Sequence, residues 1–267
     1  MKMHLNLFVC AAILASLIGC SDEQKAPVSE EKSLEIVQSS DDRAKIEKAH
    51  NKENFTASKA IEFEIVLSFG GKERLNGKMT LATNSSAGKI EYATGKTLLY
   101  NSSGIFHSDS MGTDGKLKFA AYTWSYFFLF PYKLSDPGTN WKKKTLPVLR
   151  EGQHNGYQLT FDSGIGEAPD DWYKIYANSK NNLIDVAAYI VTENKSKAKA
   201  EEDPHAIKYS DYRTINDVPI AHNWSFWGWT QDSALTEQLG EATLSNVQFV
   251  DVDKSFFEPS NDLIQIP

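Results

Sequence analysis

Three carboxylates close together are the residues with the clearest potential for acid–base chemistry: Glu167, Asp170 and Asp171 immediately precede Trp172. A pair of carboxylates can divide the acid and base roles when burial separates their pKa values. This cluster follows Gly164-Ile165-Gly166, a sequence typical of a loop, in which carboxylates are usually solvated. A structural role is therefore favoured, and a hydrolase that pairs Asp170 or Asp171 with a distant histidine is kept as an alternative.

Other catalytic motifs are incomplete. Gly95-Lys96-Thr97 resembles the end of a phosphate loop, but position 90 is Ile and Leu98–Tyr100 continues as a strand. Gly164-Ile165-Gly166 would need a glycine where Pro169 stands, and no Gly-x-Ser-x-Gly motif is present. No histidine pair has the i, i+4 spacing of a helical metal site. We therefore predict a protein that is not an enzyme and that holds no metal or cofactor.

Aromatic residues give the strongest functional indication, because seven of them lie between Tyr122 and Tyr132. Such side chains suit the walls of ligand sites. Strand alternation places Trp224 and Phe226 on one face of a later strand, and Trp227 and Trp229 on the other. The candidate cavity lining is Tyr122, Trp124, Tyr126, Phe127, Phe130, Trp224 and Phe226. Two alternatives remain open: an ordinary core, and an exposed Trp227–Trp229 ridge that binds a protein or a glycan.

The N-terminus resembles the signal of a bacterial lipoprotein. Lys2 precedes an apolar run, Leu5–Leu17, that is shorter than the roughly 20 residues of a membrane span. The run ends in Leu17-Ile18-Gly19-Cys20, which resembles a lipobox and makes Cys20 the predicted lipidation site. Ser21 at the next position resembles the signal for the outer membrane. An ordinary secretory signal with an incidental Cys20 is the alternative.

Composition narrows the class of protein. The chain has 267 residues and 41% hydrophobic content, with 28 basic and 35 acidic residues. This acidic balance argues against a general nucleic-acid binder, which needs a basic face. Cys10 lies within the predicted signal, so the mature chain would keep one cysteine, lipidated, and no disulfide. The anchor would hold the protein to the membrane, and the fold would depend on its core.

The predicted organisation has three parts: a signal peptide at 1–19, the lipidated cysteine and a flexible tether at 20–39, and one domain at 40–267. Ser39-Ser40-Asp41-Asp42 is typical of a helix start. From Ala60 onward apolar residues alternate with polar ones, which indicates half-buried strands. A second helix is expected at 119–130, ended by Pro131. We expect an exposed hairpin tip at 193–203 and a last strand at 244–252.

About eleven strands and two or three helices predict an α+β domain in which a curved antiparallel sheet, a half-barrel, wraps around the aromatic helix. This order of elements resembles the lipoprotein-carrier (LolA/LolB-like) fold. Tyr209-Ser210-Asp211-Tyr212-Arg213 resembles a late hairpin of that superfamily. Phe128-Leu129-Phe130-Pro131-Tyr132, followed by Asp136-Pro137-Gly138, resembles an uncharacterised bacterial lipoprotein family within it. The resemblance implies an apolar cavity between helix and sheet.

The resulting hypothesis is a lipid-anchored envelope protein on the periplasmic side of an outer membrane, with the cell surface as another location. Its half-barrel would bind a lipid, an acyl chain or a similar apolar molecule. No nucleic acid and no cofactor are expected, and the sequence does not identify a protein partner.

Overall fold

The computed structural model describes residues 41–267. The predicted signal peptide at 1–19, the lipidation site Cys20 and the tether at 20–39 lie outside the described residues. Among the residues described, no helix is both long enough and apolar enough to cross a membrane.

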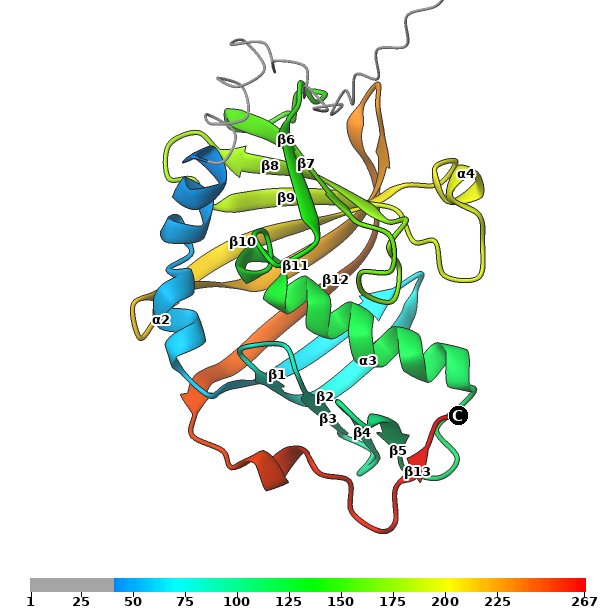
Figure 1. Cartoon of the computed structure of the whole chain (residues 1–267). Helices are drawn as coiled ribbons and strands as arrows, with labels where there is room; N and C mark the ends of the chain where they lie inside the picture. The colour runs from blue at the N-terminus through cyan, green and yellow to red at the C-terminus, as the bar shows by residue number, and fades with distance from the viewer. Residues whose placement is uncertain (1–40) are drawn as a thin grey trace, which may run out of the picture.

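One antiparallel sheet of thirteen strands organises the described chain, and it is open, in the order β13-β5-β4-β3-β2-β1-β12-β11-β10-β9-β8-β7-β6 (Figure 1). Its first meander comprises β1 (Ala60–Phe69), β2 (Lys72–Ala82), β3 (Gly88–Tyr92), β4 (Thr97–Asn101) and β5 (Gly104–His107). Its second comprises β6 (Thr139–Lys143), β7 (His154–Phe161), β8 (Trp172–Asn178), β9 (Ile184–Tyr189), β10 (His205–Ile215), β11 (Val218–Thr230) and β12 (Ala234–Val250). The short strand β13 (Ile264–Gln265) pairs with β5. The curved antiparallel sheet predicted from the sequence is confirmed.

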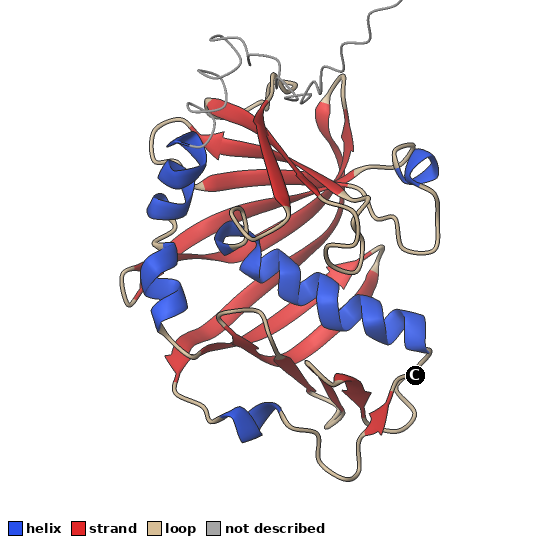
Figure 2. Cartoon of the chain, viewed as in Figure 1, coloured by secondary structure: helices blue, strands red, loops and turns tan. Residues whose placement is uncertain are grey.

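Helices are few and lie around the sheet (Figure 2). Residues 41–49 are helical and are followed by α2 (Lys52–Ala57). The longest helix, α3 (Asp114–Leu129), crosses the concave face and continues into η1 (Phe130–Tyr132). A single turn, α4 (Lys197–Ala200), lies between β9 and β10, and η2 (Lys254–Phe257) follows β12.

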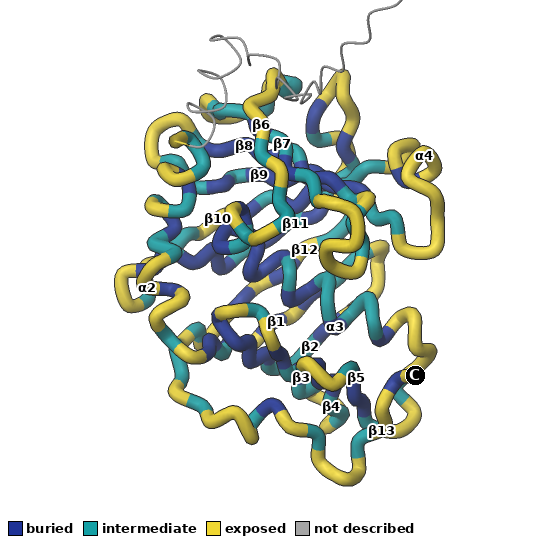
Figure 3. Tube along the Cα trace, in the orientation of Figure 1, coloured by how far each residue is buried: buried dark blue, intermediate teal, exposed yellow. Residues whose placement is uncertain are grey.

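Strand β1 shows how sequence alternation produces the core. Ile61, Phe63, Ile65 and Leu67 are almost completely buried beneath the helices. Between them, the side chain of Glu62 lies on the other face, where it accepts a hydrogen bond from Thr80 (3.2 Å) and pairs with Lys78 (3.3 Å). A strand of this kind has one apolar and one solvated face. In Figure 3 the buried positions gather on the strands behind α3.

Helix α3 ends because of Pro131, as predicted. Proline has no N–H, so the Phe127 carbonyl lacks the donor that a continuing α-helix would place at residue 131. The Tyr209 hydroxyl of β10 donates to that carbonyl instead, at 2.8 Å. The sheet therefore supplies the hydrogen bond that the helix cannot make, and it fixes the position of the helix end.

His50 joins the first helical region to the sheet. It is completely buried, and its Nε2 accepts a hydrogen bond from the Ile184 backbone N–H at 3.0 Å. The Ile184 carbonyl in turn accepts from the Tyr212 hydroxyl at 2.6 Å. A neutral ring that accepts at Nε2 carries its proton on Nδ1, which has no partner among the described residues. Burial lowers the pKa of His50 to about 3.

A second hydrophobic cluster lies on the outer face of strands β8–β11. It contains Trp172, Tyr176, Trp229 and Ala200, the last from α4. The prediction of an exposed hairpin tip at 193–203 is therefore wrong in one respect. Its charged residues are exposed, but Ala200 anchors the segment on apolar side chains that strand alternation turns outward.

Two strands differ from the prediction at the C-terminal end. Strand β12 begins at Ala234, ten residues before the predicted start, because bulges at Trp227 keep it paired to β11. Strand β13 was not predicted, because its two residues are too few to show alternation. Its neighbour Ile266 is buried and donates its N–H to the Ile105 carbonyl.

Candidate ligand-binding cavity

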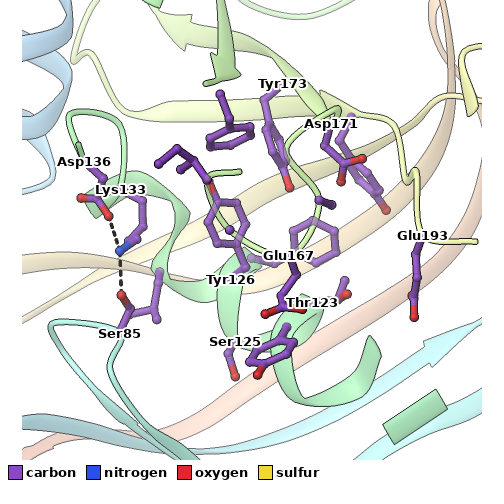
Figure 4. Close-up of a pocket in the computed structure, with 18 of the residues that line it drawn as sticks. Ser85, Thr123, Ser125, Tyr126, Lys133, Asp136, Glu167, Asp171, Tyr173 and Glu193 are labelled. Atoms are coloured by element: carbon purple, nitrogen blue, oxygen red, sulfur yellow. Dashed lines mark hydrogen bonds and ion pairs between the residues drawn. The ribbon is translucent and has the colours of Figure 1, made fainter. Parts of the chain in front are cut away.

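A cavity of about 590 Å³ lies beside α3, on the side facing the loop between β7 and β8. Its walls come from both meanders: the β2–β3 and β4–β5 turns on one side, and β8, β9 and the 162–171 loop on the other. Small-molecule sites have volumes of roughly 300–1,000 Å³, so the space is large enough for a ligand. Figure 4 shows part of its lining.

Tyrosines dominate the wall formed by α3 and the sheet. Tyr126 lies 5.6 Å from Tyr173 of β8, and Tyr122 lies 5.4 Å from Tyr100 of β4, measured between ring centroids. Tyr189 of β9 completes this wall. These rings present apolar faces to the cavity while their hydroxyl groups remain available for hydrogen bonds.

The Tyr126 hydroxyl has no hydrogen-bond partner among the described residues, although the oxygen is buried. The residue is part of the cavity lining, but its hydroxyl oxygen lies beneath the accessible surface of the wall (Figure 4). Burial raises its pKa far above the ordinary value, so the group is a neutral phenol. Buried polar groups are normally paired, so this hydroxyl is an exception among the described residues.

The loop from residue 162 to residue 171 covers one side of the cavity and is held at two points. Ile165 lies against Gly138, where a Cβ atom would stand 2.5 Å from the isoleucine Cγ1. Gly138 also has a φ of +82°, so its glycine is required both for space and for conformation. At the end of the loop, Asp171 Oδ1 accepts from the Thr192 N–H (2.8 Å) and hydroxyl (2.7 Å).

Charged residues occupy two parts of the lining. At one end Lys133 is bound by Asp136 and donates to the Ser85 hydroxyl at 2.6 Å (Figure 4). On the other side stand Glu167, Asp171 and Glu193. Burial raises the pKa of Asp171, while the Thr192 hydrogen bonds act in the opposite direction. Burial also raises the pKa of Glu193, and the charge of Lys118 opposes that change.

The predicted lining residues separate into two groups. Tyr122, Tyr126 and Phe127 line the cavity. The others are packed into the core between α3 and the sheet, where the exposed fraction of each side chain is at most 5%: Trp124, Phe130, Trp224 and Phe226. They are not among the lining residues, because their rings contact one another and the aromatic neighbours of α3. Ligand contact by Tyr122, Tyr126 and Phe127 stays a prediction.

The alternative of an exposed tryptophan ridge does not fit the structure. Trp224 and Phe226 do face α3, while Trp227 and Trp229 face the second cluster. Trp229 is only 3% exposed, and its Nε1 donates to the Tyr176 hydroxyl at 3.0 Å. Trp227 is half-buried. The segment carrying α4 covers this face, which sequence alternation could not show.

Histidines do not join the acidic cluster. Asp171 bonds Thr192, and the histidine–carboxylate pairs found in residues 41–267 lie elsewhere: His154–Asp185 at 2.8 Å and His205–Asp203 at 3.8 Å. No histidine lines the cavity within the described chain. The hydrolase alternative therefore lacks the pairing it requires. Residues 41–267 also contain no group of three side chains suited to hold a metal ion.

Sequence reasoning missed Tyr173, Tyr189 and Lys133. The strands that carry the two tyrosines were predicted, but alternation does not show which face turns toward the helix. For Tyr173 the available signal was its position two residues after Asp171 of the acidic cluster. Lys133 gave none, because its pairing with Ser85 joins residues 48 positions apart.

A scan of protein-family models and a search of curated proteins found no match to this sequence. Solved structures do match. A LolA superfamily protein from Nitrosomonas europaea aligns with a TM-score of 0.53 and 8% identity over 83% of this chain and 97% of its own. The chain has the lipoprotein-carrier (LolA/LolB-like) fold. A DUF1329 family protein from Desulfovibrio piger aligns with a TM-score of 0.51 and 12% identity, over 81% of this chain and 96% of its own. At these identities the likeness concerns the lipoprotein-carrier fold alone, and no family model supports the narrower resemblance.

Proposed function

We propose that this protein is a lipid-anchored envelope protein that binds an apolar ligand, a lipid or an acyl chain, in the cavity beside α3, without catalysing a reaction. The observation that carries the proposal is the cavity itself: about 590 Å³ of space walled mainly by aromatic and aliphatic side chains. Ligand sites are clefts or cavities of roughly 300–1,000 Å³, lined mainly by apolar and aromatic side chains with a few polar groups. The space beside α3 has this size and this kind of lining, which supports a ligand of apolar character.

Burial of an alkyl chain supplies enough free energy for binding. A chain of about 14 methylenes, at about 0.8 kcal/mol each, contributes about 11 kcal/mol before the costs of association. No catalytic group is needed for this function. The predicted anchor at Cys20 and the lipoprotein-carrier fold both fit it, and they favour the periplasmic side of the outer membrane as its location.

Decanol binding to the full chain carrying Cys20→Ser, which has no acyl group of its own, tests the proposal. Isothermal titration calorimetry should show saturable binding. Thr123 lines the cavity from α3, so Thr123→Trp should fill the space and weaken decanol binding at least tenfold. Thr56→Trp, on the exposed face of α2, is the matched control and should bind as the parent does.

Both variants must unfold with the parent's cooperativity in urea. The proposal is wrong if the parent shows no saturable binding, or if the folded Thr123→Trp variant binds decanol as tightly as the parent.

A further inference from the structure

One side of the cavity carries three carboxylates, Glu167, Asp171 and Glu193, which we call the acidic rim. Figure 4 shows them on the side away from Lys133. None of the three makes a salt bridge with any residue in the range 41–267. The fourth carboxylate of the lining, Asp136, does pair with Lys133 at the other end of the cavity, so the negative charge is concentrated on the side of the acidic rim.

The two lysines in the lining are engaged elsewhere. Lys133 is held by Asp136 and Ser85 at the opposite end. Lys118 donates to the backbone oxygen of Pro267 at 3.2 Å. Lys118 opposes the rise in the Glu193 pKa, and Lys195 opposes the rise in the Asp171 pKa. Neither lysine makes a salt bridge with the rim within residues 41–267, so the three carboxylates keep a net negative charge on this side of the cavity.

The tyrosine walls of the cavity also suit a cationic end on the ligand. The rings of Tyr122, Tyr126 and Tyr173 surround the same space, and aromatic faces attract a cation within about 6 Å of the ring centroid.

The same chain already accommodates one ammonium group by this chemistry. On the outer face, Lys174 Nζ lies 4.5 Å from the ring centroid of Trp172 and 4.4 Å from that of Trp229. It also donates to Gln231 Oε1 at 2.9 Å. Aromatic faces combined with an oxygen acceptor therefore hold a partly buried cation elsewhere in this protein, and the cavity lining contains both kinds of group.

We propose that the ligand is a cationic amphiphile: an alkyl chain in the tyrosine-walled cavity that ends in a protonated amine held by the acidic rim and the faces of the tyrosine rings. This inference rests on the proposed function, because it names the chemistry of the group that the same cavity would bind. An amphiphile with a carboxylate or phosphate end is disfavoured, since it would face three like charges.

Three probes of one chain length test the inference: decylammonium, decanol and decanoate, each below its micelle concentration, with the full chain carrying Cys20→Ser. We expect decylammonium to bind at least tenfold more tightly than decanoate. The preference should shrink as salt is raised, because two of the rim carboxylates are exposed.

A rim variant, Glu167→Gln with Asp171→Asn and Glu193→Gln, should reduce the tenfold preference for decylammonium over decanoate to less than threefold. Asn at position 171 retains an oxygen that can accept from Thr192. The matched control is Glu53→Gln with Glu241→Gln and Glu258→Gln, exposed residues outside the cavity lining. It changes the net charge by the same amount and should keep the full preference.

Each outcome separates the two proposals. Saturable decanol binding without a preference for decylammonium over decanoate overturns the cationic ligand and leaves the apolar site standing. An equal loss of preference in the rim and control variants assigns the effect to net charge and overturns the rim. Failure of all three probes to bind overturns the apolar site together with this inference.

Discussion

The two sides of α3 both carry aromatic residues, but one side packs against the sheet and the other borders the cavity. On one side Phe128 stacks on Phe63 at 4.3 Å with an interplanar angle of 18°, and Trp124 contacts Phe226 at 6.0 Å. On the other side Tyr122 and Tyr126 border open space. Phenylalanine and tryptophan fill the packed side, whereas the hollow side is lined by tyrosines together with Phe127. Aromatic density in a sequence therefore indicates a helix against a sheet, but it does not distinguish core from cavity.

The largest expected contrast is in stability. Phe128→Ala should reduce the free energy of unfolding by about 3–5 kcal/mol, because it removes a buried ring and leaves a void in dense packing. Tyr122→Ala should cost less than half as much, since its half-buried ring already borders a cavity. Urea unfolding of both variants measures the difference. Equal losses would show that the two sides of the helix are packed alike.

The second contrast concerns pH and compares the buried His50 with an exposed histidine. His50 has a pKa of about 3 in the folded protein, whereas an exposed histidine has a pKa of about 6.5. Below pH 6.5, His50 is protonated in the unfolded chain but stays neutral in the folded chain. The free energy of unfolding therefore falls as the pH falls toward 3. Between pH 7 and pH 5 we expect a loss of about 2 kcal/mol, at about 1.4 kcal/mol per pKa unit.

His50→Gln keeps an oxygen that can accept from the Ile184 N–H but cannot titrate. The difference between its unfolding free energy and that of the parent should therefore change with pH by the same amount. Burial also lowers the pKa of His205, but that residue titrates in both proteins and cancels in the comparison. Parallel pH profiles for the two proteins would refute the assignment to His50.

The smallest contrast compares two buried hydroxyl groups. Tyr209→Phe removes the donor to the Phe127 carbonyl and should cost about 1 kcal/mol, the usual net value of one hydrogen bond. Tyr126→Phe removes a hydroxyl that has no partner in the described chain, so its effect on unfolding should be close to zero. The pair differs by one oxygen atom at each site. A larger loss for Tyr126→Phe would mean that its hydroxyl is satisfied in solution.

Much of the fold follows from local sequence. Period-two alternation in β1 and the proline after α3 determine a strand face and a helix end, and both were predicted. The division of the aromatics was not, because it depends on which sheet residues lie opposite each helix position. Phe128 meets Phe63 and is enclosed, while Tyr126 meets Tyr173 beside a loop. Sequence spacing within α3 does not contain that information.

The acidic cluster shows the same limit. Glu167 and Asp171 were interpreted as solvated loop residues, and Glu167 is exposed. Their relation to Glu193 depends on the Asp171–Thr192 contact, which joins the segment before β8 to the segment after the neighbouring strand β9. Long-range contacts of this kind assemble the cavity, and a single sequence does not reveal them.

The order of the sheet has a consequence for how the binding site comes into existence. Within each meander, neighbouring strands follow one another in the chain, and β1 and β12 alone join the two meanders through pairs such as Ala60 with Val250. Pairing β1 with β12 closes a loop of nearly the whole described chain. The chain therefore loses the conformational entropy of that loop when this one ladder forms. The cavity takes its walls from both meanders and exists only once the ladder has closed. A ligand that binds there consequently stabilises the complete sheet by mass action, and an empty protein lacks that contribution.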